Sequence, residues 1–297
     1  MGPAGPAGDA AALRSGPDLT ALGDSLTSGV GCDSTPYPAL LREKIEALPS
    51  PGTVVQLGVS GETSAEIAGR AGARPWLASF AGGEIGATVE PIPVELKADT
   101  GQPITTSQNA GGLNPVDIAG VRGTLSHDGE HNWSFTRTQP GSAVRVARPA
   151  AVATRASREV RGDITIMWMG QNDSTNDATE IIAREQAVIQ ELTAPDPLWL
   201  VLGLTTRSVD YRAPMERQFL RAFGRRFLNV REYAATYAAL EEVGIAPTPE
   251  DDVAIAEGSV PPSLKSDNIH FNAAGCQVVA DAVWGRLVEF GWDDTWR

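Results

Sequence analysis

Five short runs of apolar and β-branched residues, separated by stretches with helical periodicity, constrain the fold of this 297-residue chain more than any other feature. Each run has the length of a buried strand. The runs cover residues 19–22, 53–57, 163–169, 198–204 and 227–230. The helical stretches cover residues 36–48, 176–192, 215–223, 231–243 and 273–290. Because parallel neighbours in a sheet need crossover connections, strands alternating with helices predict a doubly wound parallel α/β sheet.

Residues 75–157 interrupt this rhythm between the second and third predicted strands. Short runs there alternate apolar and polar residues, and Gly, Pro, Asn or Asp separates them, as at 88–96, 116–125, 133–138 and 142–146. Period-two alternation between turn residues is typical of small antiparallel β units. We therefore predict three parts: a flexible leader at 1–18, an α/β domain formed by 19–74 and 158–297, and an inserted β-rich domain at 75–157.

The formal net charge of −13 limits the classes of partner. A general nucleic-acid binder needs a basic surface, and adhesion to anionic lipid needs clustered Lys and Arg, so we expect neither partner. No apolar run reaches the length of a membrane span, and the first residues lack the basic start and apolar stretch of a signal peptide. The location is thus expected to be cytoplasmic by default, unless the N-terminus is truncated or the protein belongs to a larger exported assembly.

Cys32 and Cys276 are the only cysteines. Two cysteines are too few for a fold built on disulfides, and neither has neighbours with metal-ligand spacing. We therefore favour ordinary thiols over a bridge. A bridge stays open as an alternative, because both cysteines closely follow segments that the next observations place at one site.

A candidate site residue follows each of the first three predicted strands. Ser25 comes after the first, between Gly23 and Gly29; Gly61 comes after the second; Asn172 comes after the third. Open α/β sheets bind ligands at the carboxyl ends of their strands, so these residues are candidates for one site. Ser25 would be a nucleophile, while the backbone N–H of Gly61 and the Asn172 amide would be donors to an oxyanion. Taken singly, each segment could instead be an ordinary turn or a helix cap, and for the Gly61 segment alone the turn is favoured.

Asp267 stands three residues before His270, on the turn that enters the last predicted helix. A carboxylate at this spacing can bind the imidazole Nδ1–H, which leaves Nε2 free to take a proton from a serine. A serine hydroxyl is a poor nucleophile until such a base lies within hydrogen-bond reach. The alternative is a structural Asp–His pair that caps the helix.

Together, the four segments resemble the four motif blocks of the SGNH (GDSL-type) hydrolase superfamily. Ser25 lies in GDSL, Gly61 in SGET, Asn172 in GQND, and Asp267 and His270 lie in DNIHFNAAG. The resemblance implies a flavodoxin-like three-layer α/β/α parallel sheet and a Ser25–His270–Asp267 triad. It also implies an oxyanion hole formed by the N–H groups of Ser25 and Gly61 and the amide of Asn172. The implied reaction is hydrolysis of short acyl or acetyl esters of carbohydrates or small molecules through an acyl-enzyme, with no metal and no cofactor.

Two residues and the insertion depart from the family pattern. Gln56 stands where the second block often has Asn, and Phe271 replaces the Pro after the histidine. The insertion at 75–157 has no counterpart in the minimal family fold, and we consider it a possible contact surface for a glycan or a protein. Two alternatives remain for the function: an acyltransferase that uses the same triad, or an attachment module for a glycan or partner with a vestigial hydrolase core.

The segment from His127 to His131 has the composition of a metal site. However, Asp128-Gly129 within a β-rich stretch is a hairpin signal, so the two histidines should flank a turn and not share one helix face. We therefore predict a solvated turn there.

Overall fold

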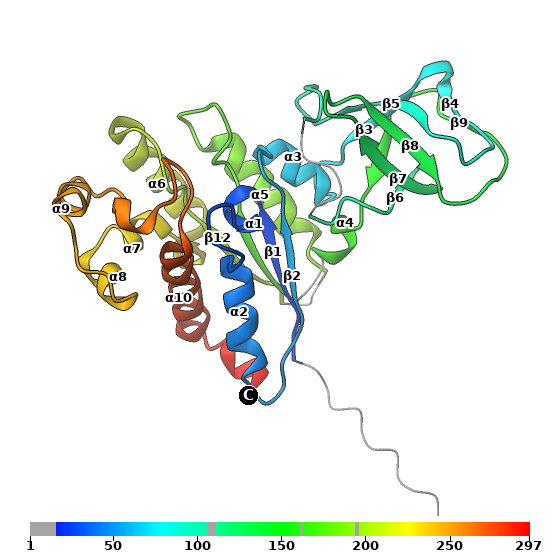
Figure 1. The fold of residues 1–297 in the computed structure, drawn as a ribbon. Helices are drawn as coiled ribbons and strands as arrows, with labels where there is room; N and C mark the ends of the chain where they lie inside the picture. Colours follow the sequence, from blue (N-terminus) through cyan, green and yellow to red (C-terminus); the bar gives the residue numbers. More distant parts are fainter. Residues whose placement is uncertain (1–15, 106–110, 161–162, 194–195) are drawn as a thin grey trace, which may run out of the picture.

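The computed structural model describes residues 16–105, 111–160, 163–193 and 196–297, and Figure 1 shows them as two bodies, a helix-covered sheet and a barrel. Most of the predicted leader, residues 1–15, lies outside the described residues. Its last residues are attached to the sheet body, because the Gly16 N–H donates to the Ser50 carbonyl and Trp296 Nε1 donates to the Pro17 carbonyl. No helix in the described ranges is long and apolar enough to cross a membrane.

The sheet has five parallel strands in the order β13-β12-β11-β1-β2. Their bounds are β1 Leu19–Gly23, β2 Val54–Gly58, β11 Ile164–Trp168, β12 Leu198–Leu202 and β13 Phe227–Leu228. In the central strands, Gly23 pairs with both Gly58 and Trp168. These three strands therefore end level with one another, and the segments that follow them emerge at one edge of the sheet.

Helices pack against the apolar residues of the strands. One core cluster joins the sheet to α2 (Tyr37–Glu46) and α10 (Ala273–Glu289), and a second joins it to α3 (Ser64–Arg70), α5 (Thr179–Glu191) and α6 (Val209–Phe223). Figure 1 shows α2 and α10 side by side in front of the strands. The shorter elements are α1 (Ser25–Ser28), α4 (Ala156–Glu159), α7 (Val230–Ala234), α8 (Tyr237–Glu242), α9 (Pro249–Ala256) and the 3₁₀ turns Gly224–Arg226, Pro262–Leu264 and Asp293–Trp296.

The second body is a closed antiparallel barrel in the order β10-β3-β5-β8-β7-β6. Its strands are β3 Leu77–Phe80, β5 Ile92–Lys97, β6 Val116–Ile118, β7 Val121–His127, β8 Trp133–Arg137 and β10 Ala150–Ala153. The 3₁₀ turn Ala81–Gly83 and a two-stranded ribbon, β4 (Glu84–Ile85) with β9 (Val144–Arg145), lie beside it. Fully buried side chains, among them Ile118, Leu125, Phe135 and Val152, fill the barrel.

The predicted fold class, a flavodoxin-like three-layer α/β/α sheet with a small antiparallel insertion, is wrong. The chain is a closed six-stranded antiparallel barrel joined to a parallel sheet with helices. The alternation of residues 75–157 revealed that one face of each strand is buried, but it held no information on whether the strands close. Closure pairs every edge strand, which removes the exposed backbone groups that an open sheet would present.

The turn between β7 and β8 forms as a hairpin around Asp128. The Asp128 carboxylate accepts hydrogen bonds from the backbone N–H groups of Glu130 and Asn132, and His127 pairs with Trp133 across the strands. The segment from His127 to His131 is thus a turn, as predicted.

The barrel is fixed to α3 at its base, where its first and last strands lie together. The Val152 N–H donates to the Trp76 carbonyl, and the Thr154 hydroxyl donates to the Arg70 carbonyl. The Trp76 ring is fully buried, and its Nε1 donates to the Glu66 carbonyl at 3.0 Å. A Cβ at Gly69 would lie 2.1 Å from the Trp76 ring, so the close approach requires glycine. The barrel therefore rests on the helix that follows the Gly61 loop.

Candidate active site

Ser25 is the first residue of α1, directly beyond the end of β1. Asp24 precedes the helix as its N-cap, and its carboxylate accepts the Leu26 N–H at 2.9 Å. Gly23 leaves no room for a side chain, since a Cβ there would lie 2.5 Å from the Trp168 carbonyl oxygen. Gly29 ends the helix with a left-handed φ of 89°. The sequence Gly-Asp-Ser thus makes a tight passage from strand to helix, with Ser25 at the carboxyl edge of the sheet.

His270 contacts Ser25 and Asp267 through its two ring nitrogens. Nε2 lies 2.8 Å from the Ser25 Oγ, and Nδ1 lies 2.7 Å from an oxygen of Asp267. The other Asp267 oxygen accepts the backbone N–H groups of His270 and Ile269 at 2.8 and 2.7 Å. The hydrogen bond from the His270 backbone N–H and, to a lesser extent, the one from the His270 side chain lower the pKa of Asp267 below its ordinary value. Asp267 is therefore a carboxylate that orients the imidazole.

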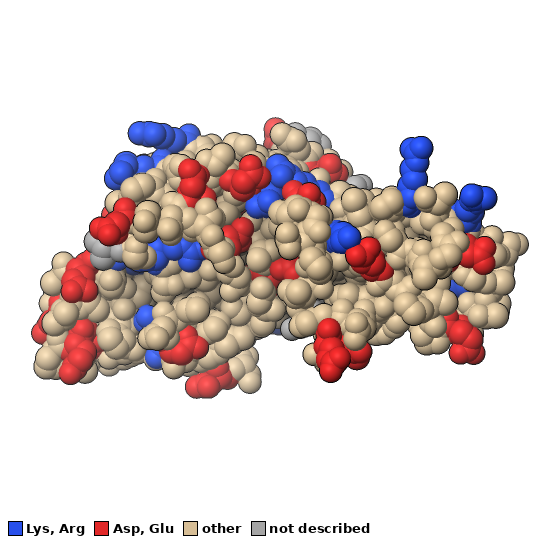
Figure 2. Space-filling model, turned by 90° about the horizontal axis from the view of Figure 1, so that it is seen from above, with Lys and Arg blue, Asp and Glu red and all other residues tan. Residues whose placement is uncertain are grey.

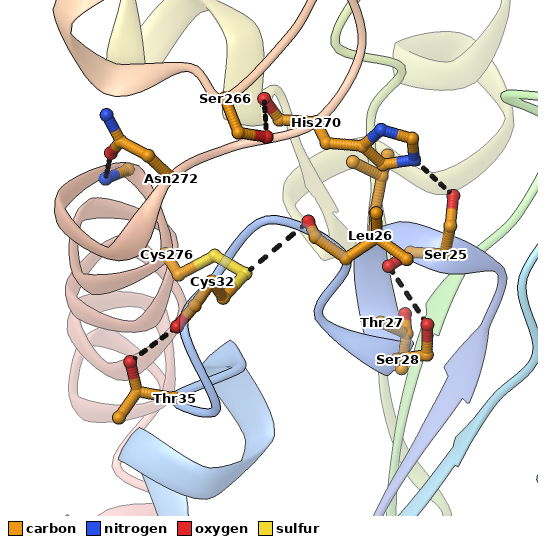
Figure 3. The surroundings of a disulfide bond; sticks show 12 residues. Ser25, Leu26, Thr27, Ser28, Cys32, Thr35, Ser266, His270, Asn272 and Cys276 are labelled. Carbon is orange, nitrogen blue, oxygen red and sulfur yellow. Dashed lines mark hydrogen bonds between the residues drawn. A yellow bond between two sulfur atoms is a disulfide. The ribbon is translucent and has the colours of Figure 1, made fainter.

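A disulfide joins the segment after Ser25 to the helix after His270. Cys32 and Cys276 are bonded, and Figure 3 shows the bond crossing from the loop after α1 to the start of α10. Our preference for two free thiols is therefore wrong. The sequence separation of 244 residues gave no local signal, and only the fold brings the two segments together.

The Gly61 loop lies beside α1. Gly61 has a φ of 83°, and a Cβ at this position would meet no other atom within 4 Å. The space above its backbone is therefore open. The hydroxyls of Ser60 and Ser28 lie 3.1 Å apart, which ties this loop to α1. The predicted donor loop and nucleophile thus lie at the same edge of the sheet.

Asn172 reaches the Gly61 loop from the third strand. Its Nδ2 donates to the Glu62 carbonyl at 2.9 Å. A side-chain amide carries two hydrogens, so a second N–H remains for a ligand. The structure thus brings the segments of all five predicted site residues to one edge: Ser25, Gly61, Asn172, Asp267 and His270.

Two charged residues that we did not predict hold these loops. Asp173 accepts both the backbone N–H and the hydroxyl of Ser64, at 2.7 and 2.6 Å, so it ties the Asn172 loop to the start of α3. Arg207 donates to the carbonyls of Gly170 and Asp173 at 2.8 and 3.0 Å. Asp173 directly follows Asn172 in sequence, but its partner Ser64 lies 109 positions away. The sequence therefore could not reveal this contact.

Arg70 and Glu62 form a fully buried ion pair beneath the Gly61 loop. Arg70 Nε donates to both oxygens of the Glu62 carboxylate, at 2.9 and 3.0 Å. Its Nη2 donates to the Leu57 carbonyl at 3.0 Å, and its Nη1 donates to the Gly111 carbonyl. One guanidinium therefore connects the end of β2, the Gly61 loop and the connection between two barrel strands. Glu62 lies before α3 and Arg70 is its last residue, so the two are not an i, i+3 or i, i+4 pair on one helix, and the sequence did not reveal their contact.

Asp24 is buried next to Ser25, and one oxygen of its carboxyl, Oδ2, has no hydrogen-bond partner among the described residues. Burial raises the pKa of Asp24 to about 7, and the nearby charges of Glu62 and Asp173 act in the same direction. The hydrogen bond from the Leu26 N–H opposes them. The carboxyl therefore changes its charge near neutral pH.

No family model and no curated protein matches the chain. Among solved structures, one crystal structure is 13% identical, with a TM-score of 0.41 over 93% of this chain and 99% of that chain. Another is BT4096, a gut microbial diltiazem-metabolizing enzyme, which is 11% identical with a TM-score of 0.41. That match covers 92% of this chain and 47% of the other, so this chain spans about half its length. Similarity at this level assigns neither fold nor function.

Proposed function

We propose that the chain is a serine-dependent carboxylic ester hydrolase of the SGNH (GDSL-type) superfamily, which works through an acyl-enzyme. One observation carries the proposal: Ser25, His270 and Asp267 form a continuous hydrogen-bonded row with distances of 2.8 and 2.7 Å. Such a row serves nucleophilic catalysis, because the central imidazole can take the serine proton while the carboxylate stabilises the charge that results.

The reaction proceeds in two halves. As the Ser25 Oγ bonds to the ester carbonyl carbon, its proton passes to His270 Nε2, and the carbonyl π electrons move to the oxygen. When the tetrahedral intermediate collapses, the C–O bond to the alcohol breaks, and His270 returns the proton to the leaving oxygen. Water then attacks the acyl-enzyme with the same transfers, which releases the carboxylic acid and restores the Ser25 hydroxyl.

The developing oxyanion needs donors on the side of Ser25 away from His270. As the first residue of α1, Ser25 has a backbone N–H with no intrahelical partner. The second donor is the N–H of Gly61, whose loop is open, and the third is the remaining N–H of the Asn172 amide. Loss of one such donor typically lowers kcat about 10²- to 10³-fold.

The substrates that fit this proposal are short acyl or acetyl esters of carbohydrates or small molecules. The proposal is tested with p-nitrophenyl acetate and purified wild-type protein. Ser25→Ala should abolish turnover, because the acyl group then has no attachment point. Ser126→Ala is the matched control: Ser126 lies in the barrel, bonded to the Ser134 hydroxyl, and its loss should leave turnover unchanged.

A phosphonate ester that modifies serine nucleophiles gives an independent measurement. Mass spectrometry should find one adduct on wild-type protein, located on Ser25, and none on Ser25→Ala. Hydrolysis by Ser25→Ala at the wild-type rate, or an adduct on another residue that abolishes turnover, would show that Ser25 is not the nucleophile.

A further inference from the structure

Arg184 is a buried arginine on α5, the helix that packs against α3. Arginine is rarely buried unless its charge is paired. Its Nη1 donates to the Ser64 hydroxyl at 3.2 Å and lies 3.8 Å from an oxygen of Asp173. Among the described residues, Arg184 is the only cation paired with the Asp173 carboxylate. A buried guanidinium thus reaches the residue that directly follows Asn172.

The contacts of Arg184 form a chain of hydrogen bonds with one direction. Because the Ser64 oxygen accepts from Arg184, the hydroxyl hydrogen of Ser64 is free to point at Asp173, whose carboxylate it meets at 2.6 Å. The Ser64 backbone N–H donates to the other oxygen of that carboxylate at 2.7 Å. Hydrogen bonds that follow one another in this way polarise and strengthen each other. Arg184 therefore holds Asp173 through Ser64 as well as by its own charge.

The position of Asp173 in turn determines where the Asn172 amide lies, because the two residues are neighbours in the chain. Asp173 is bonded to the start of α3, and the Asn172 amide is bonded to the Glu62 carbonyl at 2.9 Å. Catalysis is sensitive to such positions, since a misplacement of about 1 Å can lower a rate about 10²-fold. Arg184 can thus affect the oxyanion donor without a contact to the substrate.

Arg184 also connects this chain of contacts to the barrel. Its Nε lies 3.7 Å from the carboxylate of Asp99, which stands two positions after the end of β5. Arg74, just after α3, pairs with the same carboxylate at 3.0 Å. Figure 2 shows basic and acidic side chains next to one another in the middle of the molecule, between the sheet body and the barrel end. A barrel residue therefore contacts the guanidinium that holds Asp173.

The ion pair closest to Asn172 is also well shielded from water. The side chains of Arg184 and Asp173 are 8% and 11% exposed, so salt and water screen their attraction less than that of a surface pair. Glu180 lies 3.7 Å from Arg184 as well, but its side chain is 65% exposed. Glu185 is fully buried, and burial followed by the charge of Asp173 raises its pKa well above the ordinary value. Glu185 therefore does not compete with Asp173 for the guanidinium.

We propose, on the basis of the function proposed above, that Arg184 is a positioning residue of the oxyanion hole and that the barrel supports it through Asp99. Arg184 holds Ser64 and Asp173 in the arrangement that directs the Asn172 amide at the developing oxyanion. The inserted barrel thereby contributes to the rate of the reaction through a contact outside the catalytic loops.

The test is a double-mutant cycle in kcat for p-nitrophenyl acetate. Arg184→Met keeps much of the aliphatic stem and removes the charge and the donors. It should lower kcat about tenfold and leave KM within twofold of wild type, because Arg184 acts on the transition state through Asn172. In an Asn172→Ala background the same substitution should change kcat less than about twofold, since no amide is left to position. Arg184→Lys, which keeps the charge, should restore part of kcat.

Arg158→Met is the matched control. Arg158 lies on α4 and pairs with Asp117 of the barrel at 3.0 Å, so it also joins a helix to the barrel. No contact links it to Ser64 or Asp173 among the described residues, and kcat should stay within twofold of wild type.

Asp99→Asn tests the contribution of the barrel. It should lower kcat about two- to fivefold, the range expected for a partly exposed ion pair. In the Arg184→Met background it should have no further effect. An unchanged kcat in Asp99→Asn would refute the contribution of the barrel.

The side-chain amide signal of Asn172 in a heteronuclear NMR spectrum reports its position without turnover. The signal is identified by its loss in Asn172→Ala. It should shift in Arg184→Met and in Asp99→Asn, and it should stay in place in Arg158→Met.

The outcomes separate this inference from the proposed function. If Arg184→Met lowers kcat by the same factor with and without Asn172, or leaves the amide signal in place, the positioning role is refuted while the hydrolase stands. If the wild type hydrolyses no ester, the proposed function is refuted, and the NMR shift still decides whether Arg184 positions Asn172.

Discussion

The disulfide between Cys32 and Cys276 should account for a large part of the free energy of unfolding. The bond closes a loop with a sequence separation of 244 residues. In the chain-entropy model, closing a loop of this length lowers the entropy of the unfolded chain and so raises its free energy by about 5 kcal/mol. Small proteins are stable by only about 5–15 kcal/mol in total, so its loss should be plainly measurable. Alanine is the suitable replacement, because both cysteines are buried and a serine hydroxyl would need a partner.

The experiment is a double-mutant cycle measured by urea unfolding under oxidising conditions. Cys32→Ala and Cys276→Ala should each lower the free energy of unfolding by nearly the same amount as the double variant, since either substitution removes the whole bond. Independent contributions would instead add. Wild type in excess reductant should unfold at a urea concentration close to that of the double variant.

Two results would refute this reasoning. One is a double variant whose free energy of unfolding stays within about 1 kcal/mol of wild type, well below the estimate from loop length. The other is the titration of two free thiols in wild-type protein that has been unfolded without reductant.

Three further predictions concern the site. Asn172→Ala should lower kcat for p-nitrophenyl acetate about 10²- to 10³-fold with little change in KM, as expected for a donor that acts in the transition state; an unchanged kcat would exclude it from the oxyanion hole. Asp267→Asn should lower kcat by about 10⁴-fold without loss of circular dichroism signal, because the imidazole loses its orienting carboxylate; a loss below tenfold would mean that another group orients His270. Asp24 has a folded-state pKa of about 7, above its ordinary 3.8. Between these two pH values the folded state keeps a proton that the unfolded state releases, so the contribution of Asp24 to the free energy of unfolding falls as the pH rises. The Asp24→Asn side chain can still accept the Leu26 N–H but does not titrate. From pH 4 to pH 8, its free energy of unfolding should therefore rise relative to that of wild type by as much as about 4 kcal/mol, measured by urea unfolding. Parallel curves of this free energy against pH for the two proteins would contradict the prediction.

The buried core strands and the residues at their ends could be predicted because their signals are local. β1 and β11 are runs of apolar and β-branched residues that are buried along their whole length, and such runs stand out in sequence. Ser25 and Asn172 follow these strands directly, and parallel strands place their carboxyl ends at one edge. Asp267 and His270 are three positions apart, so their contact is also local.

What the sequence could not provide depends on contacts between distant segments. The barrel closes because β10 pairs with both β3 and β6. The alternation of apolar and polar residues within a strand does not indicate which strands it pairs with. The strands β3 and β10 escaped prediction because four residues give little alternation, and β10, with the sequence AAVA, has no polar residue to alternate with. The role of Arg70 was hidden for another reason: a charged residue in a short helix normally faces solvent, and only the fold shows that this one is buried.

The adjacency of the two ends of the barrel has a consequence for the order of folding. β1 must pair with β11, which follows it only after the whole barrel, and long loops slow such pairings. When the barrel forms first, Leu77 and Ala151 are already paired, so the chain between β1 and β11 is shortened to about half. Halving a loop recovers about 0.6 kcal/mol of closure entropy. The barrel then acts as an early-folding unit that brings β2 and β11 to the two sides of β1, and we expect its amides to gain protection from hydrogen exchange before those of the parallel sheet.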